Sequence, residues 1–340
     1  MKKLGNVLYI MTEDSYLYCQ NETIAVKVGG TEKVRIPAHT VESIICLKNT
    51  TVTTPFIGFC GEHGISLSFH SDSGRFLGRI YGGVNGNVLL RKKQYEIIGA
   101  PESAEIVRNI LCGKFANSRN VLLKSARDNS ESSSQALRRA ANMLSESFGL
   151  LLKSEGIDSM RGIEGSAASI YFDVFDDMLK TGDGSMKFEK RTRRPPENRV
   201  NALLSFVYML LKNDVCSALE SVGLDPAAGY LHALRPGRES LALDIMEELR
   251  APLCDRFVIS LINLREIQPG DFITESGEIK LCDSARRTVI DKWQRRKKEE
   301  ITHPFIKEKI PIGLIPYCQA MLLARHLRGD LNRYPPFIWR

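Results

Sequence analysis

The stretch Gly82-Gly83-Val84-Asn85-Gly86-Asn87 separates two parts of the chain whose sequence patterns differ. It is the densest glycine cluster in the sequence, and a segment of this composition does not sustain a regular helix or strand. We therefore expect a structural boundary here. This interpretation assigns residues 1–85 to a first domain, 86–100 to a hinge or linker, and 101–340 to a second domain.

The part before the glycine cluster is rich in β-branched and aromatic residues. These residues occur in short runs that end at turn signals such as Gly29-Gly30 and Pro37. The candidate strands are residues 7–10, 23–28, 33–37, 41–47 and 65–70, and one short helix is expected over 54–62. The pattern predicts a small β-rich N-terminal domain.

The part after the cluster carries apolar residues at helical spacing, and its prolines lie largely in the connections. The candidate helices are residues 104–124, 133–146, 167–179, 200–222, 241–250 and 251–264. The second domain is therefore expected to be all-α and larger than the first. Together the two parts predict an α+β multidomain chain.

Composition excludes several classes of protein. Of the 340 residues, 43% are hydrophobic and 26% are charged, which excludes a collagen, a coiled coil and a wholly disordered chain. No run approaches the roughly 18 consecutive apolar residues that span a bilayer. The start of the chain resembles a first strand more than a signal peptide. We expect a cytoplasmic protein with no membrane partner.

The cysteines show no metal-binding or disulfide pattern. No two of them form a CxxC pair, and a secreted disulfide framework is improbable in a chain of this length without a signal peptide. We expect reduced, buried thiols. The eight are Cys19, Cys46, Cys60, Cys112, Cys216, Cys254, Cys282 and Cys318.

Three segments of the helical part carry residues suited to bind a divalent cation. Glu164 precedes a run of small residues at an expected helix start, and His232 follows a Pro- and Gly-containing loop. Asp244 and Glu247 are spaced i,i+3, so they share a helix face. Each has an ordinary alternative: a helix-dipole partner, a core histidine and a solvated acidic face. Taken together, these oxygen and imidazole donors suit Mg²⁺ or Mn²⁺.

Arginines lie near these candidate ligands and near the predicted boundary. The formal net charge is +7, and guanidinium groups beside a divalent metal are what a phosphodiester substrate requires. The alternative for the arginines between His232 and Asp244 is pairing with Asp225 or Glu239. The candidate DNA-backbone contacts are Arg75, Arg79, Arg91, Arg193, Arg194, Arg235 and Arg238.

Four motifs in order make a resemblance specific. They are Arg-Gly-Ile-Glu-Gly-x-Ala-Ala from residue 161, Arg-x-Arg-Arg-Pro-Pro from 191, Gly-Leu-Asp-Pro-x-x-Gly-Tyr-Leu-His from 223, and Arg-Pro-Gly-Arg-x-Ser-Leu-Ala-Leu-Asp-x-Met-Glu-Glu from 235. The chain resembles the endonuclease/integrase family of CRISPR adaptation, which inserts new spacers. Residues 325–331 resemble its subtype I-C branch more weakly.

The resemblance implies a fold, an activity and partners. It implies a metal-dependent enzyme that joins prespacer 3′-hydroxyls to the repeat array, with Glu164, His232 and Glu247 as catalytic residues and as ligands of Mg²⁺ or Mn²⁺. Some members have Asp-x-x-Asp where this chain has Asp244-x-x-Glu247, so either carboxylate is a candidate direct ligand. The implied partners are double-stranded DNA, a second copy of the chain that pairs through the N-terminal domain, and the second, smaller universal adaptation protein.

Two alternatives from other functional classes stay open at this point. One is another divalent-metal nuclease, of DNA repair or of RNA processing. The other is a non-catalytic DNA-binding scaffold in which the acidic residues have lost their role. An assay for joining distinguishes the first alternative, and any effect of a divalent ion distinguishes the second.

Overall fold

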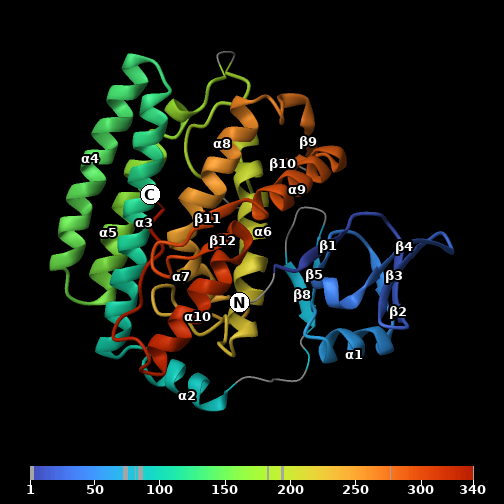
Figure 1. Ribbon diagram of the computed structural model, residues 1–340. Coiled ribbons are helices and arrows are strands. Elements are labelled where there is room, and N and C mark those ends of the chain that lie inside the picture. The colour runs from blue at the N-terminus through green and yellow to red at the C-terminus, as the bar shows by residue number, and fades with distance from the viewer. Residues whose placement is uncertain are drawn as a thin grey trace. The chain divides into compact units, whose positions relative to one another are not determined.

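The computed structural model describes residues 4–71, 76–80, 82, 87–181, 184–192, 195–275 and 277–339. The chain forms two compact units (Figure 1). The first comprises Met1–Gly86 together with Ile290–Glu299, and the second comprises Asn87–Val289 with Glu300–Arg340. The segment from 290 to 299 thus clusters with residues that lie far from it in the sequence.

The first unit contains two four-stranded sheets. One has the strand order β4-β3-β2-β6, in which β2–β3 and β3–β4 are antiparallel and β2–β6 is parallel. The other has the order β1-β5-β7-β8, in which only the β7–β8 pair is antiparallel. The strands are β1 (Asn6–Ile10), β2 (Ser15–Gln20), β3 (Thr23–Val28), β4 (Thr31–Pro37), β5 (Val41–Cys46), β6 (Thr50–Val52), β7 (Ser66–His70) and β8 (Phe76–Ile80).

A buried apolar core joins these strands to helix α1 (Thr54–Glu62). Leu17, Ile24, Ile44 and Leu67 are each fully buried in it. Strands were expected at the positions of β1, β3, β4, β5 and β7, but β2, β6 and β8 were missed. In β2, Leu17 is buried while Tyr16 beside it is exposed, an alternation that is short and flanked by polar residues. The predicted β-rich N-terminal domain is confirmed.

The second unit is built from helices, with two short antiparallel β ribbons. Its helices are α2 (Val88–Glu96), α3 (Pro101–Arg127), α4 (Glu131–Lys153), α5 (Ile157–Asp173), α6 (Arg199–Ser221), α7 (Ser240–Leu249), α8 (Arg256–Asn263), the start of α9 (Asp283–Lys297) and α10 (Ile315–Leu327). The ribbons pair β9 (Phe272–Glu275) with β10 (Glu278–Leu281), and β11 (Glu300–Thr302) with β12 (Lys309–Pro311). The predicted helical second part is confirmed, with the ribbons as an addition to its expected all-α content.

Helix α6 is the hydrophobic centre of this unit. It is the one helix of the described residues that is long and apolar enough to cross a membrane, but two thirds of its most apolar window is buried inside the protein. Leu203, Val207 and Leu210 are fully buried on it. It therefore has the burial of a core helix, and α7, α8 and α10 pack against it.

The start of helix α5 and the state of the cysteines were both predicted from the sequence. Helix α5 begins at Ile157, so Glu164 lies well inside the helix and the expected helix start at residue 167 is wrong. Glycines at 162 and 165 have open space around them and are tolerated within the helix. Because glycine is unfavourable in helices, these two residues weakened the helical pattern in the sequence. All eight cysteines are free, and six of them are buried.

Candidate functional site

The loop that carries His232 is held by Asp244 of α7. One carboxylate oxygen, Oδ2, accepts hydrogen bonds from the backbone N–H groups of Tyr230 (2.6 Å) and Leu231 (3.0 Å). The other, Oδ1, accepts from the N–H of His232 (2.9 Å). A Cβ on Gly229 would lie 2.5 Å from the backbone of Ser240, so only glycine allows the loop to approach α7 this closely.

The same aspartate orients the imidazole of His232. Nδ1 lies 2.7 Å from Asp244 Oδ1, and Nε2 lies 3.7 Å from Glu247 Oε1. When Nδ1–H donates to Asp244, the lone pair of Nε2 faces Glu247. A histidine ligand whose other ring nitrogen is bonded to a carboxylate is the common arrangement at metal sites.

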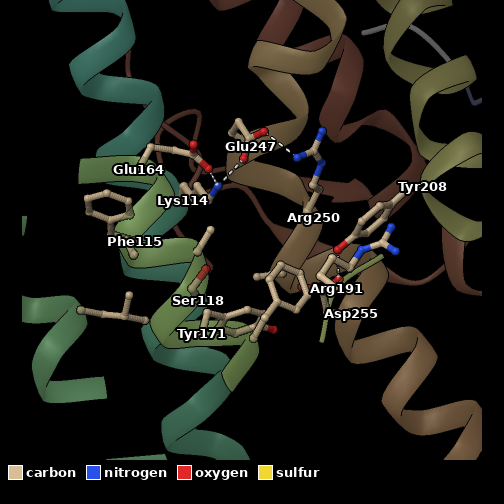
Figure 2. Close-up of a pocket in the computed structure, with 15 residues that line it drawn as sticks. Lys114, Phe115, Ser118, Glu164, Tyr171, Arg191, Tyr208, Glu247, Arg250 and Asp255 are labelled. Atoms are coloured by element: carbon tan, nitrogen blue, oxygen red, sulfur yellow. Dashed lines mark hydrogen bonds and ion pairs between the residues drawn. The ribbon is translucent and has the colours of Figure 1, made fainter. Parts of the chain in front are cut away.

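Glu164 and Glu247 converge from α5 and α7 on one cation, the ammonium of Lys114 on α3 (Figure 2). Lys114 Nζ lies 2.6 Å from Glu247 Oε2 and also contacts Glu164 Oε1. The Glu247 side chain is 2% exposed, whereas that of Glu164 is 26% exposed. Glu164 and Glu247 thus meet through Lys114, while His232 lies near Glu247 and is bonded to Asp244.

Arg250 supplies a second cation to the buried Glu247. Its Nη1 donates to Glu247 Oε1 at 2.5 Å (Figure 2). Burial alone raises the pKa of Glu247, but attraction from Arg250 and Lys114 outweighs burial and lowers this pKa to about 2. Glu247 is therefore a carboxylate at neutral pH.

A π-helical segment, Arg250–Asp255, links α7 to α8, and its first and last residues line a pocket together with Lys114, Glu164 and Glu247 (Figure 2). Such segments alter the direction of side chains and are frequent at functional sites. Here Tyr208 donates to Asp255 Oδ1 at 2.6 Å, and the Tyr208 ring lies 5.3 Å from the guanidinium of Arg191 and 5.4 Å from that of Arg250. Burial raises the pKa of Asp255 to about 6, although the hydrogen bond from Tyr208 opposes this.

Helices α3 and α7 pack closely against each other at Gly113 and Glu248, the residues adjacent to Lys114 and Glu247 in the sequence. A Cβ on Gly113 would lie 3.0 Å from Cβ of Glu248, which marks the close approach of α3 to α7. The carboxylate of Glu248 accepts from Phe337 N (2.9 Å), from Gln319 Nε2 (2.9 Å) and from the Tyr334 hydroxyl. The C-terminal segment thus contacts both α3 and α7 close to Lys114 and Glu247 and helps to fix the spacing of these two helices.

The seven predicted DNA-binding arginines have different surroundings. Arg75, Arg193 and Arg194 lie outside the described residues. Arg79 lies on β8, with its guanidinium 5.9 Å from the Phe76 ring centre, and Arg91 donates from Nε to the carbonyl of Gly223 at 3.2 Å. Their role in binding DNA stays a prediction.

Arg235 and Arg238 lie on the connection between His232 and α7. Arg235 is exposed and Arg238 is half-buried, and neither forms an ion pair with any residue that the structure describes. The two acidic residues considered as their partners are engaged elsewhere. Asp225 accepts from the Tyr95 hydroxyl (2.6 Å), and Glu239 pairs with Lys212 (3.2 Å).

Sequence reasoning missed Lys114, Tyr208, Arg250 and Asp255. Lys114 lies on a helix with no other candidate residue, and nothing in its neighbourhood marks it. The sequence Arg250-Ala251-Pro252 offered one signal, because a proline inside a helical pattern disturbs the regular hydrogen bonding. The π-helical segment lies at this position.

The sequence and the fold have counterparts in known proteins. The family model for CRISPR associated protein Cas1 matches residues 8–295, which is most of the chain. The chain belongs to the Cas1 family. The CRISPR-associated endonuclease Cas1 2 of Rhodospirillum rubrum is 46% identical over 346 residues, covering 100% of both chains.

Two solved structures have the same fold as this Cas1 family member. A Cas1 protein from Thermotoga maritima is 26% identical, with a TM-score of 0.83 over 98% of this chain and 100% of that one. A chain of a Cas6-RT-Cas1–Cas2 complex is 25% identical, with a TM-score of 0.84 over 100% of this chain and 36% of that one.

Family membership confirms the function implied by the four motifs. The chain is a CRISPR-associated endonuclease of the adaptation integrase type, and the alternatives of an unrelated nuclease and a non-catalytic scaffold are set aside. The subtype stays a prediction.

Proposed function

We propose that Glu164, His232 and Glu247 hold a catalytic Mg²⁺ or Mn²⁺ in this enzyme. The observation that carries the proposal is the convergence of two carboxylates, from separate helices, on one cation with His232 Nε2 3.7 Å from Glu247. Asp244 then acts by orienting His232, because its oxygens accept from three backbone N–H groups of the loop, whereas the oxygens of Glu247 accept only from the side chains of Lys114 and Arg250 among the described residues. Glu247 is accordingly the direct ligand of the i,i+3 pair.

The residues present fit a divalent cation in donor type. Two carboxylates and an imidazole nitrogen are hard or borderline donors of the kind that Mg²⁺ and Mn²⁺ accept. As placed, no group of three His, Cys, Asp or Glu side chains in the described part of the chain forms a ready-made metal cage. The ammonium of Lys114 stands at the point where the two carboxylates meet.

The proposed reaction is transesterification. A prespacer 3′-hydroxyl forms a new bond to a phosphorus of the repeat, and the bond from that phosphorus to the repeat's own 3′-oxygen breaks. The attacking hydroxyl loses a proton and the leaving oxygen gains one, so no net oxidant or proton source is needed. A bound divalent ion supplies charge neutralisation at the phosphate and at the leaving oxygen. Replacement of the hydroxyl by water gives cleavage.

The chain's own residues position the DNA. Arg235 and Arg238 lie next to His232 in the sequence and are without an ion-pair partner among the described residues, so they are available to phosphate oxygens. Contacts of this kind hold the backbone and carry little sequence information. Arg75, Arg79, Arg91, Arg193 and Arg194 are proposed as further contacts to the duplex.

The proposed assembly contains a homodimer and a second protein. Strand β4 is a sheet edge whose residues are nearly all exposed, which supports pairing through the N-terminal unit. The solved complex of matching fold that contains Cas1 and Cas2 supports a heterocomplex with the smaller adaptation protein. We place the enzyme in the cytoplasm, where it would meet the repeat array. Light scattering that finds only monomers, with DNA present, contradicts the dimer.

The test of the proposed site is the loss of metal-dependent cleavage and joining in single variants. Glu164→Ala, His232→Ala and Glu247→Ala are each expected to abolish both reactions with Mn²⁺ while they leave duplex binding nearly unchanged. Glu275→Ala is the control, because this exposed residue pairs with Lys280 on the β9–β10 ribbon, away from the proposed ligands in the sequence. Full cleavage by the His232→Ala protein would refute the ligand assignment.

A further inference from the structure

Lys114 occupies the position between the two proposed carboxylate ligands. Its ammonium contacts Glu164 Oε1 and Glu247 Oε2, and its side chain is only 14% exposed. Glu247 Oε1 also accepts a hydrogen bond from Arg250 Nη1 at 2.5 Å. The ion-paired cluster formed by Lys114, Arg250, Glu164 and Glu247 therefore contains two positive and two negative groups, which balance without any added ion.

We propose that Lys114 is a built-in competitor of the catalytic metal, exchanged for it when DNA arrives. This inference rests on the proposed function, because it takes Glu164 and Glu247 to be the metal ligands. Lys114 is a positioning residue in this scheme. In the metal-free protein it holds the two carboxylates together, and in the loaded protein its charge is available to the DNA phosphate.

The charge balance leads to this inference. A divalent ion added to a neutral, largely buried cluster leaves two uncompensated positive charges, and burial of unpaired charge is costly. Moving the ammonium away from the carboxylates lowers that cost, and a phosphate at the site lowers it again. Metal and DNA should therefore bind cooperatively, because the phosphate compensates the positive charge that the metal adds and the metal compensates the negative charge of the phosphate.

A purely structural lysine predicts something different. If Lys114 served only to tie α3 to α5 and α7, its loss would loosen the carboxylates, and both metal affinity and activity would fall. As a competitor, its loss removes an obstacle to the metal and also removes a positive charge that the phosphate needs. The signature of the proposal is thus tighter metal binding by the DNA-free variant, combined with a smaller gain in metal affinity when the duplex is added.

The experiment measures Mn²⁺ affinity by isothermal titration, with and without a phosphorothioate-linked duplex that keeps its charge and resists cleavage. The proteins are the wild type, Lys114→Met, Lys114→Arg, Glu164→Ala and Lys212→Met. Lys212→Met is the matched control, since this lysine has a similar exposure of 20% and pairs with Glu239 outside the cluster. Melting temperatures with and without Mn²⁺ are a second measurement on the same samples.

In the wild type, the duplex is expected to raise Mn²⁺ affinity roughly tenfold, within the usual range of coupling between sites. Without DNA, Lys114→Met should bind Mn²⁺ about tenfold more tightly than the wild type, and the duplex should add little. Its metal-free form should melt at a lower temperature and gain more from Mn²⁺. Lys114→Arg and Lys212→Met should resemble the wild type.

The failures of the two ideas are distinguishable. If Glu164→Ala binds Mn²⁺ as the wild type does, the proposed metal site is wrong. If Glu164→Ala loses Mn²⁺ while Lys114→Met binds it no more tightly than the wild type, the metal site stands and the competition by Lys114 is refuted. Should Lys114→Met fail to melt cooperatively, Lys114→Gln, which keeps a hydrogen-bond donor near the carboxylates, takes its place with the same two criteria.

Discussion

Replacement of Asp244 by alanine tests whether this residue is a support for the loop or a metal ligand. The change removes the acceptor of three backbone N–H groups, those of Tyr230, Leu231 and His232. It also removes the partner of His232 Nδ1. Asp244 itself is fully buried, so solvent does not readily replace what is lost.

The expected loss of stability follows from these contacts. A buried donor left without a partner costs about 1–3 kcal/mol, and three donors at the lower limit give about 3 kcal/mol. For a unit of this size, 1 kcal/mol corresponds to a change of roughly 2–4 °C in Tm, so Asp244→Ala should lower the Tm by about 6–12 °C. Asp244→Asn should lie between it and the wild type, because one acceptor oxygen remains.

Thermal unfolding followed by circular dichroism, paired with a Mn²⁺-dependent cleavage assay, checks both parts. Cleavage by Asp244→Ala should fall about 10–100-fold, as for other residues that orient a ligand, whereas Glu247→Ala should show no cleavage. Asp158→Ala is the control, since Asp158 is an exposed partner of Arg161 on α5 and should leave the Tm nearly unchanged. A Tm of Asp244→Ala within about 2 °C of the wild type contradicts the supporting role.

Three further outcomes are expected. Arg238→Ala should lower the magnitude of the log–log salt slope of duplex binding by about 0.9, measured by fluorescence anisotropy with unrelated sequences; an unchanged slope removes Arg238 from the DNA contacts. Gly113→Ala should force α3 away from Glu248 by a few tenths of an ångström and lower the Tm by roughly 2–6 °C, and a rise in Tm would show that the contact has slack. Burial raises the pKa of Asp255 to about 6, so its neutral form is favoured in the folded state. The free energy of unfolding of the wild type therefore decreases as the pH rises from about 4 to 6 and Asp255 loses its proton. The stability of Asp255→Asn relative to wild type, from urea unfolding, should therefore increase by up to about 3 kcal/mol across that window, and a constant difference refutes the raised pKa.

The sequence by itself determined the family, the division into a β-rich and a helical part, and the candidate ligands. Alternating and helical periodicities record which side chains face a core, and these are local properties of the chain. The Gly-Tyr-Leu-His motif and the Asp244-x-x-Glu247 pair are likewise local, because a loop or a single helix turn fixes their spacing. Glu164, His232 and Glu247 could therefore be named from their motifs.

The sequence erred or was silent where the decisive neighbours are distant. The placement of Glu164 at a helix start was wrong because small residues and glycines weakened the periodic signal ahead of residue 167, while the packing of α5 carried the helix back to Ile157. The segment from 290 to 299 clusters with residues 1–86, which end some 200 residues earlier in the chain. No local pattern encodes such a contact.

Tertiary structure alone distinguished the surroundings of Asp244 and Glu247, the two candidate ligands on α7. Both are buried and both lie on one helix, but the loop that approaches at Gly229 takes the oxygens of Asp244, and α3 with α5 presents a cation and a carboxylate to Glu247. Lys114 lies 50 residues from Glu164 and 133 from Glu247. Because electrostatic interactions depend on distance in space and on burial, the partner of a charged group is set by the packing of helices and not by its neighbours in the sequence.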